Sequence, residues 1–172
     1  MRAKPGQRLN QAGVDLARRV GDGMGRFDRV VTSLVPRAYE TAVAMGYAVD
    51  EQMEALSSTP DGLIGEDAEV DLYQGWVAMQ RAARAGGIAE RYVRLQSQLM
   101  RAVAAALPDG GRALVISHGG IVEASAVGCR PDDDFAVWGR ACGYCEGVRL
   151  SFDGDRCAGA EPLRVPGSTL ES

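Results

Sequence analysis

The segment ALVISHGGIVEASAV, residues 113–127, changes character in its middle. Its first four residues are apolar without alternation, which predicts a strand covered on both faces, as in a parallel sheet. Ser117, His118 and two glycines then interrupt the run, and a helical pattern follows. Because parallel strands need long crossover connections, usually helices, this unit by itself indicates an α/β fold.

A second unit with the same order lies earlier in the chain, in RVVTSLVPRAYETAVAMG, residues 29–46. The β-branched run RVVTS predicts a short strand. Pro36 suits the first turn of the helix that follows, and Gly46 suits its end. Two strand–loop–helix units predict neighbouring strands of one parallel sheet.

Further helices are expected before and between these units. Residues 11–24 place apolar side chains at steps of three and four after Asn10, a suitable N-cap. The clearest helical pattern covers residues 90–106, where the predicted apolar face consists of Tyr92, Leu95, Leu99, Val103 and Ala106. The intervening residues 50–87 are rich in turn formers, and we expect a loop and one short helix there.

The C-terminal third has a different pattern. Val148, Leu150 and Phe152 alternate with polar residues, and Asp153-Gly154 is a hairpin turn signal. The sequence therefore predicts a three-layer α/β/α sandwich with a mainly parallel sheet and an edge hairpin. At 172 residues the chain fits one domain, which we place at residues 1–165, with a polar tail at residues 166–172.

Composition excludes several classes of partner. The net charge is −4, and the arginines are scattered among carboxylates, which disfavours nucleic acid. No apolar window approaches the about 20 residues that a membrane span needs, and residues 1–10 lack the apolar core of a signal peptide. We expect a cytoplasmic protein without membrane contact.

The cysteines leave a minor alternative open. Cys142 and Cys145 have the spacing of a redox or metal pair, but zinc would need two more ligands from Cys129, Cys157 or His118, and none of these belongs to a second paired motif. We favour small buried hydrophobes kept reduced in the cytosol, with no metal. A zinc or thiol redox protein built on this pair is the weakest of the functional interpretations.

The candidate site lies where the two predicted strands end. In an open α/β sheet, ligands bind outside the carboxyl ends of the strands, and these ends carry Ser33 and Arg37 in one unit and His118 and Gly119 in the other. Helix N-termini favour anions, glycine allows close backbone approach, and arginine offers a planar donor fork to phosphate. A phosphate pocket is predicted. The alternatives are a capping or core histidine and a solvated arginine paired with Glu40.

These residues carry a resemblance to a known family. RVVTSLVPRAYETAVAMG and ALVISHGG, preceded by LNQAG, resemble the histidine phosphatase superfamily, and the resemblance runs over about residues 7–150. It implies a phosphoryl-transfer enzyme that works through a phosphohistidine, with no metal or organic cofactor. Arg37 matches the family's phosphate-gripping arginine. His118 matches the second histidine of its pocket, not the nucleophile.

The sequence departs from the family at the nucleophile. In the family an Arg-His-Gly motif ends the first strand, which should precede LNQAG, whereas MRAKPGQR contains neither an apolar run nor a histidine. Either the gene starts upstream of Met1, which we favour, or the chain is natively short. A natively short chain would be a phosphate-binding relative without catalysis, or a decaying gene product that folds poorly. We expect negligible phosphatase turnover from the sequence as it stands. Arg2, Lys4 and Arg8 could bind phosphate, but they cannot attack phosphorus as an imidazole nitrogen does. Phosphomonoester hydrolysis that is lost in His118→Ala would contradict this.

Two function classes follow from the resemblance. The first is phosphomonoester hydrolysis or phosphoryl transfer, and the second is non-catalytic binding of a phosphorylated small molecule or phosphoprotein. A carboxylate often acts as the general acid in this family, and the turn-rich middle of the chain offers Glu54, Asp61, Glu66 and Asp67. The sequence does not choose among these four.

Overall fold

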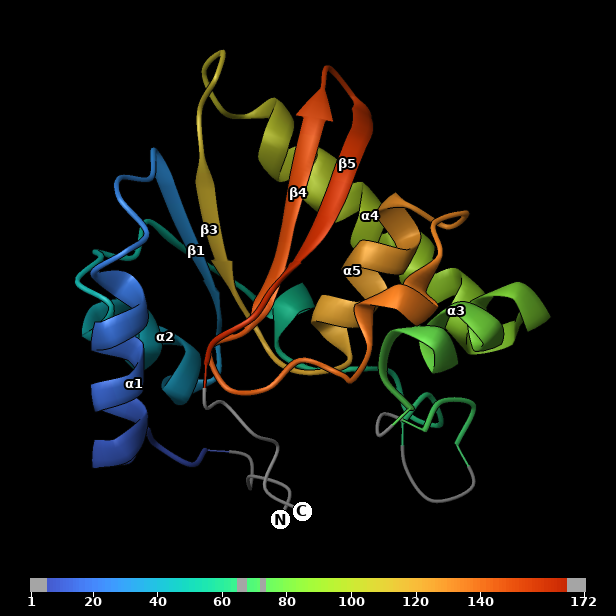
Figure 1. The fold of residues 1–172 in the computed structure, drawn as a ribbon, viewed down its shortest axis with the longest axis horizontal. Coiled ribbons are helices and arrows are strands. Elements are labelled where there is room, and N and C mark those ends of the chain that lie inside the picture. The colour runs from blue at the N-terminus through green and yellow to red at the C-terminus, as the bar shows by residue number, and fades with distance from the viewer. Residues whose placement is uncertain (1–5, 65–67, 72–73, 167–172) are drawn as a thin grey trace.

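The computed structural model describes residues 6–64, 68–71 and 74–166. Helices and strands alternate along most of the chain before a C-terminal hairpin (Figure 1). The helices are α1 (Gln11–Gly21), α2 (Pro36–Ala44), α3 (Gly75–Ala85), α4 (Gly87–Ala105) and α5 (Ile121–Cys129), with short 3-10 helices η1 (Glu54–Leu56) and η3 (Phe135–Trp138). The strands are β1 (Arg29–Ser33), β2 (Glu51–Met53), β3 (Ala113–Ile116), β4 (Gly147–Asp153) and β5 (Arg156–Leu163).

The parallel sheet brings the two predicted strands together. Its order is β2-β1-β3, and both pairings are parallel. Val30 lies opposite Leu114, and Thr32 lies opposite Ile116. Because β1 and β3 run in the same direction, their carboxyl ends, and the loops that follow them, meet at one edge of the sheet.

Helices cover both faces of this sheet, which confirms the predicted three-layer architecture. Val30 and Leu114 pack with Ala42 of α2 on one face. Val31 and Val115, the next residues along each strand, belong instead to the larger core built with α3, α4 and α5. This alternation follows from the two-residue period of a strand, and Figure 1 shows α1 and α2 on one side and α3, α4 and α5 on the other.

Local signals placed the N-terminal helices correctly. The Asn10 side chain caps α1 by accepting a hydrogen bond from the Gly13 N–H at 2.8 Å, as predicted. Pro36 is in the first turn of α2, and Gly46 follows that helix with a φ of 91°. Such a φ favours glycine, which explains why the helix ends there.

The predicted apolar face of α4 is partly wrong. Leu95 is 54% exposed, whereas Gln96 is fully buried and donates from Nε2 to the Ala55 carbonyl at 3.0 Å. Ser97 is buried too, where α4 meets Gly128 of α5 at very close range. The contact with α5 and the small residues Ser97 and Gly128 determine which face of α4 is buried, and side-chain hydropathy alone does not.

Along the described ranges, no helix combines the length and apolar character that crossing a bilayer requires.

Strand β2 was missed, and it pairs with β1 at Val31, Thr32 and Ser33. Its three residues have no alternating apolar pattern, so only the neighbouring strand specifies it. Arg29 of β1 also forms an ion pair with Glu51 of β2. The short helix expected in the same region is present as α3.

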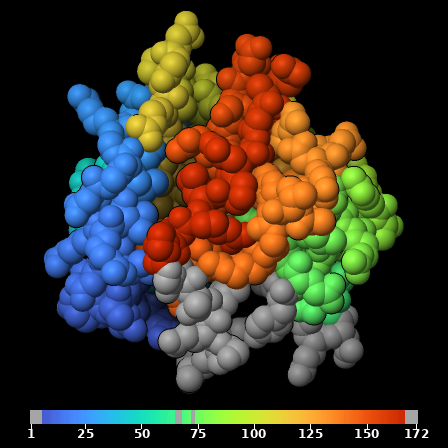
Figure 2. Space-filling view, viewed as in Figure 1, coloured from blue at the N-terminus to red at the C-terminus, as the bar shows by residue number. Residues whose placement is uncertain are grey.

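The predicted hairpin is confirmed as β4 and β5, with Gly154 at a φ of 59° in its turn. In the space-filling view it covers the centre of one face of the molecule (Figure 2). Among the described residues, β3 pairs with β1 alone and β4 with β5 alone, so each has one edge without a described partner. The expected strand before LNQAG and the domain boundary at residue 165 stay predictions. Residues 167–172 of the tail lie outside the described residues.

Candidate functional site

The carboxyl ends of β1 and β3 bring Ser33 and His118 into contact. Oγ of Ser33 lies 2.8 Å from Nε2 of His118. Ser33 is fully buried as the last residue of β1, and His118 is half-buried two residues beyond β3. The parallel pairing therefore creates the meeting of the two loops that the sequence predicted.

Arg37 reaches the other side of the same imidazole from the first turn of α2. Its Nη2 lies 3.4 Å from Nδ1 of His118, and the arginine is half-buried. A guanidinium only donates hydrogen bonds, so Nδ1 must accept. This assigns the proton of the neutral ring to Nε2, which then donates to Ser33 Oγ. All three side chains thus converge on one ring.

The environment keeps His118 neutral near pH 7. Burial, and to a lesser extent the neighbouring Arg37 charge, lowers the pKa of the imidazole from 6.5 to about 4. An anion bound between the two residues would oppose this lowering of the pKa, because it stabilises both positive charges. The pair is therefore suited to respond to a bound anion by proton uptake.

The short helix η1 fixes both loops from one side. The Leu34 N–H donates to Ser57 Oγ at 2.9 Å, just after η1. From the other loop, Ser117 Oγ donates to the Leu56 carbonyl at 2.7 Å. Ser117 is therefore an anchor for the histidine loop. Both contacts preorganise the site before any ligand arrives.

The glycine turn after His118 leaves space beside Gly119, whereas the backbone N–H groups of the next three residues are hydrogen-bonded within the chain. Gly119 is exposed, and a Cβ built on it would meet nothing within 4 Å. The N–H groups of Ile121 and Val122 each donate to the His118 carbonyl at 3.2 Å. The Gly120 N–H donates to the Glu123 carboxylate at 2.6 Å. Contrary to the sequence expectation, these three amides at the start of α5 are engaged within the chain, and the open approach is at Gly119.

Glu123 is the site residue that sequence reasoning missed. Its side chain is 1% exposed, and its carboxylate joins the glycine turn to the Cys142 N–H. The available signal was an acidic residue at the third position of an otherwise apolar helix, where carboxylates reach back to the first free amides.

The carboxylates considered as general acids lie in different places. Glu54 is the exposed first residue of η1, the element that contacts both loops. Asp61 lies on an exposed turn further along the chain. Glu66 and Asp67 lie outside the described residues. The assignment among the four stays open.

Glu40, the alternative partner considered for Arg37, has bonds elsewhere. Its carboxylate accepts from Arg8 Nη1 and from the Leu9 N–H, each at 2.7 Å. Glu40 therefore ties the segment before α1 to α2.

The cysteine pair lies on the loop between η3 and β4. Cys142 is buried, Cys145 is half-buried with a φ of 57°, and both are free thiols. Burial raises the pKa of each of these thiols, which makes them poor nucleophiles. Within the described ranges, no group of three or more histidine, cysteine or acidic side chains is arranged to hold a metal ion.

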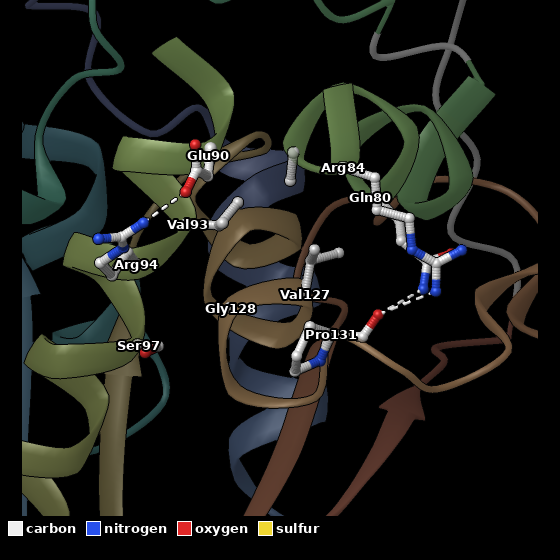
Figure 3. Close-up of a pocket in the computed structure, with 10 residues that line it drawn as sticks. Gln80, Arg84, Glu90, Val93, Arg94, Ser97, Val127, Gly128 and Pro131 are labelled. Atoms are coloured by element: carbon white, nitrogen blue, oxygen red, sulfur yellow. Dashed lines mark hydrogen bonds and ion pairs between the residues drawn. The ribbon is translucent and has the colours of Figure 1, made fainter. Parts of the chain in front are cut away.

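A cavity of about 250 Å³ lies away from this site, among α3, α4 and α5 (Figure 3). Gln80 and Arg84 both donate to the Pro131 carbonyl at its edge, at 2.8 and 3.2 Å. Arg94 forms an ion pair with Glu90 on the same helix. These polar groups satisfy one another around an apolar lining.

Two solved structures with mycobacterial names are similar to this chain. Mycobacterial hydrolase 1 aligns over 98% of this chain and 91% of its own, with 18% identity and a TM-score of 0.60. The protein of the open reading frame Rv3214 from Mycobacterium tuberculosis aligns over 73% of this chain and 69% of its own, with 17% identity and a TM-score of 0.47. A search of curated protein sequences gives no significant match. The first of these similarities shows a shared fold.

The family assignment comes from the sequence as a whole. The sequence model of the histidine phosphatase superfamily (branch 1) matches residues 1–161, which is most of the chain. The match includes both strand–loop–helix units, β4 and most of β5. The chain belongs to the histidine phosphatase superfamily, branch 1.

Proposed function

We propose that Ser33, Arg37, His118 and Gly119 bind the phosphoryl group of a phosphorylated small molecule or phosphoprotein. The observation that carries this proposal is the convergence of Ser33 and Arg37 on the two ring nitrogens of His118. Membership of the superfamily supports phosphatase or phosphotransfer activity in general. We infer phosphomonoester hydrolysis or phosphoryl transfer through a phosphohistidine as the reaction.

Each residue has a role that its chemistry allows. Arg37 supplies a planar donor fork and a permanent charge for two phosphate oxygens. His118 turns from neutral to protonated as the anion binds and adds a second positive charge. Ser33 orients the ring, and Gly119 lets an oxygen approach the backbone without a side chain in the way.

The nucleophile of the reaction is expected on an Arg-His segment, because His118 is the single histidine of the sequence. In the first step a neutral imidazole nitrogen would form a bond to phosphorus while the bond to the leaving oxygen breaks, and that oxygen would take a proton from a general acid. Water would then attack phosphorus and release the histidine and inorganic phosphate. We expect the 172-residue chain to bind phosphate without measurable turnover.

The test compares three proteins with p-nitrophenyl phosphate as substrate. These are the 172-residue chain, the chain extended before Met1 by an apolar strand that ends in Arg-His-Gly, and the same extension with its histidine replaced by glutamine. We expect turnover in the second protein alone and its loss on Arg37→Ala. An extended protein that binds phosphate at the site and still shows no turnover contradicts the enzymatic proposal.

A non-catalytic phosphate-binding role is the alternative, and one observation favours it. The single histidine already has both ring nitrogens within reach of Ser33 and Arg37, so it is placed to hold an anion rather than to attack. Saturable phosphate binding in every form of the chain, without hydrolysis in any, is the outcome that this alternative predicts.

A further inference from the structure

The Glu123 carboxylate bridges two segments that are distant in the chain. Oε2 accepts from the Gly120 N–H at 2.6 Å, and Oε1 accepts from the Cys142 N–H at 3.1 Å. Gly120 ends the turn that carries His118, whereas Cys142 lies in the loop of residues 139–146 before β4. A single side chain therefore connects the phosphate-site turn to a loop from another part of the fold.

Burying a carboxylate is unfavourable unless its oxygens are well bonded. Burial raises the pKa of Glu123, while the N–H groups of Cys142, of Glu123 itself and of Gly120, together with the Arg164 charge, act in the opposite direction. These amides surround the carboxylate at the positive end of α5. They form a cradle shaped for one planar anion.

The second partner of the bridge is rigid. Arg164 Nη1 donates to the Ala141 carbonyl at 3.0 Å and to the fully buried Glu146 carboxylate at 2.9 Å. On the other side, Gly75 opens α3 with a φ of 64°, and a Cβ there would lie 2.7 Å from the Ala141 nitrogen. Figure 1 shows this loop passing on the side where β1 and β3 end. It can therefore serve as a fixed reference for the glycine turn.

We propose that Glu123 is a positioning residue. By bonding to both segments, it fixes the position of the turn of His118, Gly119 and Gly120 relative to the 139–146 loop. A carboxylate that merely capped α5 would need only the Gly120 N–H. The second bond, to Cys142, adds nothing to capping and serves to couple the two segments. The proposal rests on the proposed function in one respect, because the consequence of misplacing the turn is read out as phosphate affinity.

The experiment uses the NMR signals of the His118 ring, which are unambiguous because the sequence has one histidine. The variants are Glu123→Gln and Glu123→Ala. Glu90→Gln is the matched control, because Glu90 also lies in the first turn of a helix but is exposed. Each protein is examined before and after inorganic phosphate is added, and Glu123→Ala is also titrated with formate.

Glutamine has one acceptor oxygen, so Glu123→Gln leaves either Gly120 or Cys142 without its acceptor. We expect shifted His118 ring signals without phosphate, and phosphate affinity weaker by about tenfold or more, since small displacements of a binding group have large effects. Formate should occupy the cradle in Glu123→Ala and return the His118 signals toward those of the native protein. Glu90→Gln should leave both readouts unchanged.

The proposal is overturned if Glu123→Gln folds with native His118 signals, even if its thermal stability is lower. It is also overturned if formate changes nothing in folded Glu123→Ala. Hydrogen exchange in the native chain tests the bridge where a variant does not fold, because the Gly120 and Cys142 amides must both be protected, and rapid exchange of either one rejects it. Absence of a phosphate response in the native chain would reject the proposed function, while the phosphate-free His118 signals still test the positioning role.

Discussion

Oγ of Ser33 lies 2.8 Å from Nε2 of His118, although 85 residues separate the two in the chain. The parallel pairing of β1 with β3 makes this contact, because it aligns the ends of both strands. Arg37 completes the group from the first turn of the helix after β1. The end of β1 and the first turn of α2 thus each place one side chain against the imidazole of His118, which lies in the loop after β3.

Removal of the Ser33 hydroxyl should lower stability modestly and release the ring. Ser33→Ala deletes the acceptor of the His118 Nε2 proton and of the Val35 N–H, which lies 3.3 Å from Oγ. We expect a loss of about 1–2 kcal/mol in the free energy of unfolding by urea, because a buried donor loses its partner. The exposed Ser151 provides the control, and Ser151→Ala should cost under about 0.5 kcal/mol. Equal losses in both variants would argue against the buried contact.

Removal of Arg37 should weaken phosphate binding and raise the pKa of His118. The guanidinium is one of the two causes that lower this pKa, the larger being burial, so Arg37→Ala should move the titration midpoint upward from about 4. Loss of a charge-assisted contact should weaken phosphate binding by about tenfold or more. NMR titrations of the ring with pH and with phosphate measure both effects. Arg81→Ala, an exposed change on α3, should leave both constants unchanged.

The low pKa of His118 predicts a specific pH dependence of stability. The unfolded imidazole, with a pKa of 6.5, binds a proton that the folded one does not bind until about pH 4. Stability should therefore fall as the pH drops from about 6.5 to about 4 and should not depend on this group above that window. His118→Gln removes this contribution, so the stability difference between native and variant proteins must change within the window. A pH-independent difference would contradict the low pKa.

Two glycines should respond oppositely to the same substitution. A Cβ on Gly128 would lie 2.0 Å from the Val93 carbonyl oxygen, where α5 crosses α4. Gly128→Ala should therefore cost about 3 kcal/mol through overpacking. Gly119→Ala meets open space, so it should fold normally. It should weaken phosphate binding if an oxygen approaches the backbone there, as proposed, because the methyl group would stand in the way. Thermal unfolding and phosphate titration of both variants give the result, and unaltered phosphate affinity in Gly119→Ala would remove Gly119 from the site.

Glu146 should anchor the 139–146 loop above mildly acidic pH. Burial alone would raise the pKa of its carboxyl, but bonds from Arg140, from the Gly143 and Val165 N–H groups and from Arg164 hold it at about 2. Glu146→Gln should cost about 3 kcal/mol at pH 7 because it breaks a buried ion pair.

This contribution should be complete above pH 4.5 and should be lost as the pH falls toward 2, because only the folded carboxyl stays ionised in that interval. Glu161→Gln is the control, since its pair with Arg149 is exposed and should contribute under about 1 kcal/mol. Acid unfolding curves of the native and variant proteins measure both. A stability difference for Glu146→Gln that stays constant down to pH 2 would contradict this role.

Much of the fold could be predicted because local signals agree with tertiary packing. Asn10 and Pro36 mark helix starts and Gly46 a helix end by their own backbone chemistry. The apolar run of β1 is buried, and that of β3 is partly buried. The meeting of His118 with Arg37 followed from a topological rule about parallel strands, not from any local pattern.

The missed features depend on partners that are distant in sequence. Strand β2 exists because β1 offers an edge, and Gln96 is buried because the Ala55 carbonyl accepts its amide proton. Glu123 bonds to Cys142, 19 residues further along the chain, and its burial depends on the path of that loop. A sequence pattern does not contain these long-range partners, so structure was needed to find them.

The most direct test of the central claim is an NMR titration of the single histidine of the native chain with inorganic phosphate at constant ionic strength. If Ser33, Arg37, His118 and Gly119 form a phosphate site, the ring signals will shift saturably, and the pKa of His118 will rise from about 4 as the anion binds. Ring signals and a pKa that stay unchanged up to saturating phosphate would show that the cluster around His118 is not a phosphate site.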